Sequence, residues 1–337
     1  MKARLSGEQT GWKADARQAS SKNAALSLVS GQSHEKLLPP ESTGTGTGQH
    51  AVILVSSTFV VAVLNYALNI ILGWTLPAAQ YGQIGVSQTL IFICLWLISA
   101  GLPWVVTRSL AHAHDAAATS EDREEAWRTY KSARLANAFL TMLVVALLQV
   151  AFFGGWLPLE ASYAPLIVLV GVTVSALGLG SIPNAGLQGL FRFRRISALR
   201  VGEAAVNIVV SVVLVLAGYG VSGALGGFAA SAILASVLAV WSMSGNRSSQ
   251  IEGWGGLEAL RTAVPMTLVV FGGVLLTNID LLSIKFLGGL NSDSLSGDYQ
   301  VAAILARAPL FIGTALISAF YPRIAQDSGN RQAAREL

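Results

Sequence analysis

Eight apolar stretches, each long enough to cross a lipid bilayer, follow one another along the chain from Ala51. An α-helix rises about 1.5 Å per residue, so about 20 apolar residues span the hydrocarbon layer. Helices are favoured there because a helix satisfies its own backbone hydrogen bonds in lipid. We therefore predict an all-α, polytopic transmembrane helix bundle. The predicted spans are 51–73, 84–106, 135–155, 164–190, 200–219, 221–243, 264–288 and 299–321.

The composition also indicates an integral membrane protein. Hydrophobic residues make up 53% of the 337 residues and charged residues 12%, which is about half the charged share of a soluble domain. The single cysteine, Cys94, falls within the second predicted span and excludes a disulfide or cysteine-metal framework. No metal site is expected, because the HAHD motif after this span lacks further ligands.

Residues 1–50 differ in composition from the rest of the chain. They are rich in Ser, Gly, Lys and Glu, and they predict a disordered cytoplasmic tail. The first and last predicted hairpins resemble each other weakly, with a polar residue in mid-span (Asn69, Asp280) and a glycine in the following turn. Such repeats are common in transporters. We therefore expect a six-helix lobe at 51–243, a cytoplasmic connection at 244–263, the first hairpin of a second lobe at 264–323 and a cytoplasmic end at 324–337.

Lysine and arginine residues are confined to alternate connections. Six lie in the tail, five after the second span, four after the fourth, two after the sixth and three after the eighth. The other connections, at 74–83, 156–163, near 220 and at 289–298, contain none. The positive-inside rule then places the N-terminus and every even-to-odd loop in the cytoplasm.

The last two predicted spans contain ionisable residues, which are costly in hydrocarbon and usually face a protein interior or a wet cavity. Asp280 lies seven residues before Leu287, near the outer end of its span, and Arg307 lies eight residues into the next span. Both are therefore about 10–12 Å deep and could pair. Such a pair is either a gate or coupling site, or a structural salt bridge. Lys285 is nearer the interface, where it could extend toward water.

We predict that five polar residues form the substrate path or gate: Asp280, Arg307, Lys285, Asn278 and Asn69. A second group, Arg192, Arg194, Arg195 and Arg200, is interleaved with phenylalanines at the inner membrane face. It either sets orientation by contacting anionic lipid or recruits a phosphate-bearing lipid substrate. Glu203 could pair locally with Arg200, and Asn207 lies one turn further on. Nucleic-acid binding is not expected, because the basic stretch lies against the bilayer.

Several segments resemble a known family. TNIDLLSIKFLG, followed by SGDYQVAAIL and FYPRIA, resembles the seventh and eighth helices of polysaccharide biosynthesis proteins. NAGLQGLFRFRRISALRVGEA is similar to their helix 4–5 connection, and LPAAQYGQIGVSQTL to their first outer turn. These are lipid-linked oligosaccharide (O-antigen repeat-unit) flippases of the multidrug/oligosaccharidyl-lipid/polysaccharide exporter superfamily. Such proteins usually have twelve to fourteen spans, so an eight-span chain is either a fragment or takes its second lobe from another subunit.

The resemblance implies a bacterial inner-membrane transporter, not an enzyme, that flips a lipid-linked glycan from the inner to the outer leaflet by alternating access. Arg307 and Lys285 would attract the pyrophosphate, with Asp280 as a proton-sensitive partner. No cofactor is expected, and a proton or sodium gradient is the candidate energy source. Expected partners are the glycan substrate, membrane lipids and glycan-assembly proteins. Two alternatives stay open: a multidrug or cation antiporter of the same superfamily, and a membrane-embedded glycan polymerase or acyltransferase.

Overall fold

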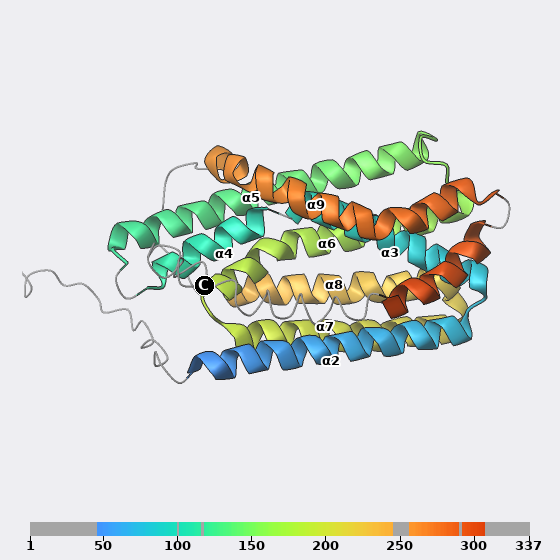
Figure 1. The fold of residues 1–337 in the computed structure, drawn as a ribbon, viewed down its shortest axis with the longest axis horizontal. Coiled ribbons are helices and arrows are strands. Elements are labelled where there is room, and N and C mark those ends of the chain that lie inside the picture. Colours follow the sequence, from blue (N-terminus) through green and yellow to red (C-terminus); the bar gives the residue numbers. More distant parts are fainter. Residues whose placement is uncertain (1–45, 100, 116–117, 245–255, 290–291, 307–337) are drawn as a thin grey trace, which may run out of the picture. The chain divides into compact units, whose positions relative to one another are not determined.

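The computed structural model describes residues 46–99, 101–115, 118–244, 256–289 and 292–306. These residues form helices joined by short connections, which confirms the predicted all-α bundle (Figure 1). Most of the predicted tail and the end of the predicted eighth span lie outside the described residues. The helices are α2 (Gly46–Thr75), α3 (Ala78–Ser99), α4 (Leu102–Ala113), α5 (Ser120–Phe153), α6 (Ala164–Gly189), α7 (Phe193–Leu214), α8 (Gly220–Ser244), α9 (Gly256–Leu287) and a further helix at 292–306.

Six helical segments are long and apolar enough to cross a membrane, but one of them, Phe193–Ser244, has 52 residues. A straight helix of that length would measure about 78 Å, more than twice the hydrocarbon thickness. The chain instead reverses at the short π-helix η2 (Val215–Tyr219), where Gly218 has φ 93° and Gly220 has φ 53°. These left-handed conformations favour glycine. The segment is therefore two spans, α7 and α8, which gives seven spans among the described residues.

Several helices begin or end outside their predicted spans, and two of these differences have a clear local cause. The second span was expected at 84–106, but α3 covers Ala78–Ser99 and a separate helix, α4, follows. Pro103 lies in the first turn of α4, where a missing N–H is tolerated, whereas inside a continuous helix it would break a hydrogen bond. The third span was expected from 135, but α5 begins at Ser120. A capping box between Thr119 and Asp122 starts it there, ahead of the apolar part.

Helix α6 lies at the centre of the bundle and packs against α3, α4, α5 and α8 (Figure 1). It supplies large apolar side chains to the core, among them Ile167, Val170 and Ile182, all fully buried. Glycines permit the closest approaches: Gly178 faces Thr141 of α5, and Gly180 faces Ser236 of α8. Small residues at helix contacts are typical of membrane bundles, where packing replaces the hydrophobic effect between helices.

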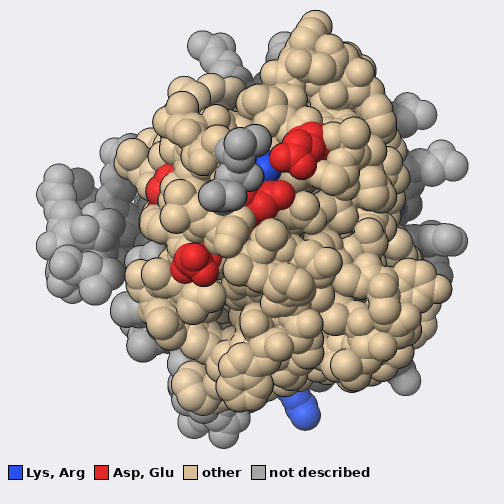
Figure 2. All heavy atoms as spheres, turned by 90° about the vertical axis from the view of Figure 1, so that its right-hand side faces the viewer, with Lys and Arg blue, Asp and Glu red and all other residues tan. Residues whose placement is uncertain are grey.

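The two ends of the bundle differ in charge. The connections that follow α2, α5, α7 and α9 meet at one end, which we call the α2–α3 end (Figure 1). Figure 2 shows this end face, where acidic side chains gather and basic ones are sparse. Most described basic residues belong to the α4–α5 and α6–α7 regions at the other end: Arg108, Arg123, Arg128, Lys131, Arg134, Arg192, Arg194 and Arg195.

Helices α7 and α8 meet at Gly227, which lies against Ser211. The Ser211 Oγ atom donates a hydrogen bond to the Ala224 carbonyl oxygen at 2.9 Å. A Cβ atom added to Gly227 would lie 2.0 Å from that Oγ and 2.5 Å from the Ser211 backbone nitrogen. The backbone atom cannot rotate away, so only glycine fits while the helices remain this close.

We predict that Gly227→Ala lowers stability by about 1–3 kcal/mol, the usual cost of overpacking. The matched control is Gly202→Ala on α7, where an added Cβ meets nothing within 4 Å. Because alanine has the better helix propensity, this control should leave stability unchanged or raise it by up to about 1 kcal/mol. Thermal unfolding of the purified protein in detergent measures both. Equal behaviour of the two variants would contradict the α7–α8 contact.

Candidate functional site

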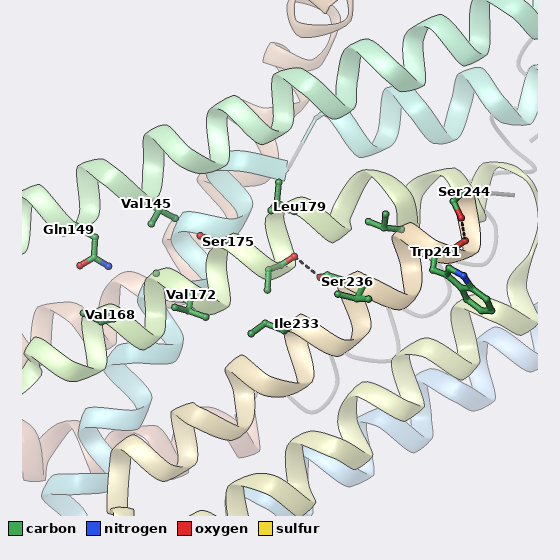
Figure 3. Close-up of a pocket in the computed structure, with 14 residues that line it drawn as sticks. Val145, Gln149, Val168, Val172, Ser175, Leu179, Ile233, Ser236, Trp241 and Ser244 are labelled. Atoms are coloured by element: carbon green, nitrogen blue, oxygen red, sulfur yellow. Dashed lines mark hydrogen bonds between the residues drawn. The ribbon is translucent and has the colours of Figure 1, made fainter. Parts of the chain in front are cut away.

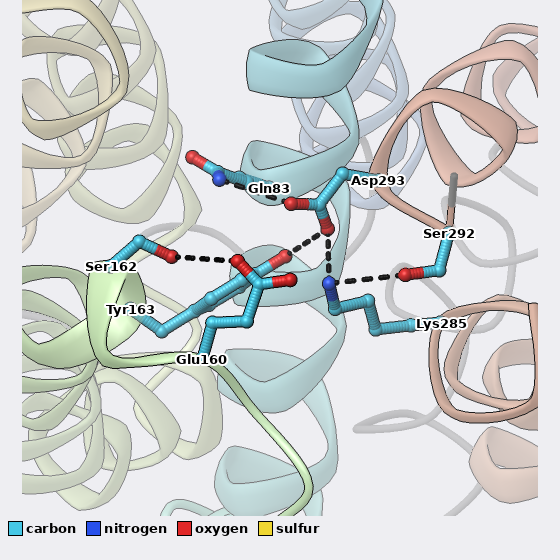
Figure 4. Close-up of polar contacts among 7 residues, drawn as sticks. All are labelled: Gln83, Glu160, Ser162, Tyr163, Lys285, Ser292 and Asp293. Carbon is cyan, nitrogen blue, oxygen red and sulfur yellow. Dashed lines mark hydrogen bonds and ion pairs between the residues drawn. The ribbon is translucent and has the colours of Figure 1, made fainter. Parts of the chain in front are cut away.

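A buried lysine anchors a polar cluster at the α2–α3 end. Lys285 of α9 is only 5% exposed. Its Nζ atom lies 2.5 Å from the Asp293 Oδ1 atom and donates to the Ser292 Oγ atom at 3.2 Å. Both partners belong to the first turn of the helix at 292–306. The ammonium group is thus held by the next helix instead of extending to water (Figure 4).

Asp293 also joins this lysine to two other parts of the bundle (Figure 4). The Tyr163 hydroxyl donates to Asp293 Oδ1 at 2.7 Å, and Gln83 Nε2 of α3 donates to Oδ2 at 3.1 Å. Tyr163 ends the short 3₁₀ helix η1 (Ala161–Tyr163) that leads into α6, and its ring centroid lies 5.0 Å from the lysine Nζ atom. We call Gln83, Tyr163, Lys285, Ser292 and Asp293 the Lys285 cluster.

The cluster keeps its carboxylate ionised. Burial acts to raise the pKa of Asp293, but the hydrogen bonds from Lys285, Tyr163 and Gln83 outweigh it and lower that pKa below its ordinary value. A carboxylate that accepts several hydrogen bonds is stabilised in its charged form. The Lys285–Asp293 contact is therefore a charged pair, and it connects α3, the start of α6, α9 and the helix at 292–306.

Two glycines allow the helix at 292–306 to approach α3 closely enough for this cluster. A Cβ atom on Gly82 would lie 1.9 Å from the Asp293 carbonyl oxygen, and one on Gly297 would lie 2.1 Å from the Ala78 carbonyl oxygen. The backbones therefore touch at this crossing. Close backbone contact through small residues is a common device of membrane helices.

On α3, α9 and the helix at 292–306, four buried polar atoms lack hydrogen-bond partners among the described residues. They are Ser87 Oγ of α3, Asn278 Oδ1 of α9, and Ser296 Oγ and Gln300 Oε1 of the helix at 292–306. A buried polar group left unsatisfied costs about 1–3 kcal/mol. Water or a polar ligand would remove that cost. We call these four residues together with Gln88, which accepts from Gln300 Nε2 at 3.4 Å, the polar junction.

The predicted path residues on α2 and α9 lie as follows. Asn278 is buried and donates to the Val274 carbonyl oxygen at 2.8 Å. Asp280 accepts a hydrogen bond from the Tyr299 hydroxyl, which links α9 to the helix at 292–306. Asn69 accepts from the Tyr81 hydroxyl at 3.3 Å. Arg307 lies outside the described residues, so the structure does not describe its predicted pairing with Asp280.

The four inner-face arginines separate into two groups. Arg194 and Arg195 are exposed, and Arg192 is half-buried just before α7. Arg200 lies one to two turns further along α7 and lines a pocket within the bundle. The structure thus brings Arg200 together with polar residues of other helices and leaves the other three at the start of α7.

The pocket that contains Arg200 has a volume of about 210 Å³ and lies among α2, α3, α6, α7 and α8. Phe92 and Phe228 contribute aromatic rings to its wall. We call it the polar pocket, because half of the residues that line it are polar: Asn65, Gln88, Thr173, Arg200, Glu203, Asn207 and Ser231.

A larger groove of about 820 Å³ lies between α5, α6 and α8 (Figure 3). Its wall is mainly aliphatic, with Leu179, Ile233 and Trp241 among its residues. The Ser236 hydroxyl in this groove already donates to the Ala176 carbonyl oxygen at 2.5 Å. None of the described residues that line this groove is ionisable. It suits a hydrocarbon chain, whereas the polar pocket and the polar junction suit a hydrated group.

Four members of the Lys285 cluster were missed by the sequence reasoning. Ser292 and Asp293 fall in the predicted connection at 289–298, and Tyr163 and Gln83 lie far from Lys285 in sequence. One signal was available for Asp293. It is the acidic residue nearest to Lys285 after the span ends, and a lysine near the end of a span needs a counter-charge if it is buried.

Together these features define a multi-pass membrane protein with the fold of membrane transporters. The polysaccharide biosynthesis protein family matches residues 47–327. The chain therefore belongs to the polysaccharide biosynthesis protein family, as the resemblance implied. Among curated proteins, none matches the sequence at a significant level.

Solved transporter structures share the fold. The MATE multidrug transporter DinF-BH superposes with a TM-score of 0.63 at 14% identity, over 88% of this chain and 69% of that one. A Vibrio cholerae MATE transporter, VcmN, gives 0.60 at 10% identity, with 86% and 66% covered. A MOP superfamily transporter from Pyrococcus furiosus gives 0.58 at 18% identity, with 85% and 68% covered. At these identities the likeness concerns the fold alone.

We predict that Asp293→Asn destabilises the protein by about 3–5 kcal/mol, because it leaves a buried ammonium without its counter-charge. Adding Lys285→Met should restore part of the loss, since the unpaired charge is then gone. Thermal unfolding in detergent of the wild type, both single variants and the double variant completes the cycle. Strictly additive effects would show that the two groups do not interact.

Proposed function

We propose that this protein flips a lipid-linked oligosaccharide or polysaccharide precursor from the inner to the outer leaflet by alternating access, as a carrier and not an enzyme. Its family supports a role in polysaccharide biosynthesis. The charge difference between the two ends of the bundle supports a cytoplasmic N-terminus and an outward-facing α2–α3 end. We place the protein in the bacterial inner membrane.

The polar junction is the observation that carries this proposal. A glycan head group has many hydroxyls, and each loses hydrogen bonds to water if it enters bare hydrocarbon. Ser87, Asn278, Ser296 and Gln300 offer unsatisfied polar atoms inside an otherwise apolar bundle. They lie on three helices that cross each other, so a separation of these helices would expose them to one continuous wet route. The lipid tail can meanwhile remain in the bilayer.

The Lys285 cluster closes the outer end of this route in the described conformation. Its hydrogen bonds hold α9 and the helix at 292–306 against α3 and the start of α6. Opening the route to the outside requires these bonds to break, while water replaces them at the surface. This makes the cluster a gate, and we expect the helix pair after 264 to begin the second, moving lobe.

The charged groups have a second role in this scheme. Arg192, Arg194 and Arg195 lie where a diphosphate in the inner leaflet would meet them, and arginine binds phosphate in a bidentate manner. Arg307, and Lys285 once released from Asp293, would attract the diphosphate during passage. Asp280 would balance that positive charge. A proton or sodium gradient is the proposed energy source.

The competing function is export of cationic drugs, since structures with this fold include multidrug transporters. Glu203 in the polar pocket would attract a cation, but Arg200 in the same pocket opposes it. The ionisable groups of the pocket therefore favour a glycan over a cationic drug.

We predict that the wild-type protein, reconstituted in liposomes, moves a fluorescent undecaprenyl-pyrophosphate-linked oligosaccharide between leaflets. The Lys285→Met/Asp293→Asn variant should transport at least about tenfold more slowly, because a carrier whose outer gate does not close cannot alternate between its two open states. The fraction of lipid reached by a reagent that attacks only one leaflet gives the rate.

A matched control removes an ion pair elsewhere. Glu124 and Arg128 form an exposed pair at 2.7 Å on α5, so Glu124→Gln/Arg128→Gln should transport at the wild-type rate. If the wild-type protein transports a cationic rhodamine dye but not the lipid-linked glycan, the proposal is wrong and the drug-export function replaces it.

A further inference from the structure

The polar pocket lies near the middle of the membrane. Gln88 is ten residues from the start of α3, Asn65 is ten residues from the end of α2, and Ser231 is eleven residues from the start of α8. At 1.5 Å per residue these residues are about 15–17 Å from the α2–α3 end. Polar groups at this depth cost free energy, so those that occur there usually have a function.

An arginine and a glutamate line this pocket without a hydrogen bond or a salt bridge between them. Arg200 and Glu203 are three residues apart on α7, and both contribute to the wall. Neither forms a hydrogen bond, or an ion pair within 4.0 Å, with another residue in the described part of the chain. A pair that merely fixed helix packing would be expected to close. These two side chains instead leave a hydrogen-bond donor and an acceptor unused, both in the wall of the polar pocket.

The other lining groups extend this donor and acceptor set. Side-chain amides such as Asn65 can both donate and accept, while the Arg200 guanidinium only donates and an ionised Glu203 only accepts. Asn65 uses no side-chain hydrogen bond among the described residues. Phe92 and Phe228 add apolar faces to the same wall. Planar polar groups beside an aromatic ring match the hydroxyls and the C–H face of a sugar ring.

Charge and size exclude the other simple ligands. A lone cation would be repelled by Arg200 and a phosphate by an ionised Glu203, whereas a neutral polyol can use both side chains. The volume of about 210 Å³ is below that of a site for a drug-sized molecule, which is at least about 300 Å³. The pocket therefore fits one ring and not a whole oligosaccharide.

We infer that the polar pocket binds one neutral sugar ring of the transported glycan, with Arg200 donating to its hydroxyls and Glu203 accepting from them. This inference rests on the proposed function, because it names a subsite for the same substrate. Gln88 supports the connection, since it lines the pocket and also contacts Gln300 of the polar junction. A sugar passing along the junction thus has the pocket directly beside it.

Free monosaccharides test the pocket without transport. We use glucose, galactose and N-acetylglucosamine, each at about 50 mM, on full-length protein purified in a detergent without a sugar head group. At least one of them should raise the thermal unfolding temperature of the wild type by about 3 °C more than sorbitol does. Sorbitol controls for the general stabilisation by osmolytes. The extra rise should vanish in Arg200→Gln/Glu203→Gln and persist in Arg128→Gln, which changes an exposed arginine of α5.

Glu203→Gln alone is the milder second variant, should the double variant unfold. It keeps the shape of the side chain but replaces one carboxyl oxygen by an NH2 group, which cannot accept a hydrogen bond, so at least half of the extra rise should be lost. An equal rise in the wild type and in Glu203→Gln would overturn the inference. So would a rise caused by a cationic rhodamine dye, but by none of the sugars, that depends on Glu203.

The two proposals fail in different ways. If the wild type flips the lipid-linked glycan but no sugar gives an extra rise, the pocket inference is wrong and the function stands. If a sugar gives a rise that depends on Arg200 and Glu203 but no glycan is flipped, the pocket binds sugar and the transport function is wrong.

Discussion

The structure of this protein depends on giving hydrogen-bond partners to the polar groups that lie inside the hydrocarbon layer. Backbone groups are satisfied by helices, and small residues such as Gly178, Gly180 and Gly227 let those helices pack closely. The polar side chains that remain are confined to a few places. The Lys285 cluster satisfies its charges completely, whereas the polar junction and the polar pocket keep unused hydrogen-bonding capacity. That difference separates the proposed gate from the two places where we propose that a polar substrate binds.

The helical bundle was predictable because long apolar runs can hardly form anything else in a membrane. The division of the second apolar run into α3 and α4 could not be predicted from hydropathy, since Pro103 lies within a run that is apolar on both sides. Likewise, the start of α5 at Ser120 depends on the capping box of Thr119 and Asp122, which precedes the apolar segment. Boundaries follow local chemistry that hydropathy does not record.

The site was only partly predictable. Lys285 and Asn278 were recognised because ionisable and polar residues are rare in spans, but their surroundings depend on long-range packing. Tyr163 reaches Asp293 over 130 positions of sequence, and Gln83 reaches it over 210. Arg200 was assigned to the inner face because it follows three other arginines. Its place in the polar pocket depends on how five helices pack around that space.

The central claim is that the polar junction can be reached by water, and cysteine labelling tests it most directly. In a Cys94→Ala background, the only native thiol is absent. Ser296→Cys should then react with a water-soluble maleimide, and faster when Lys285→Met/Asp293→Asn opens the gate. Leu276→Cys, at a position of α9 that is 81% exposed on the bundle surface, should stay unreactive in liposomes, because a thiol in lipid does not ionise. Equal lack of reaction at both positions, with the gate intact or removed, would contradict the account.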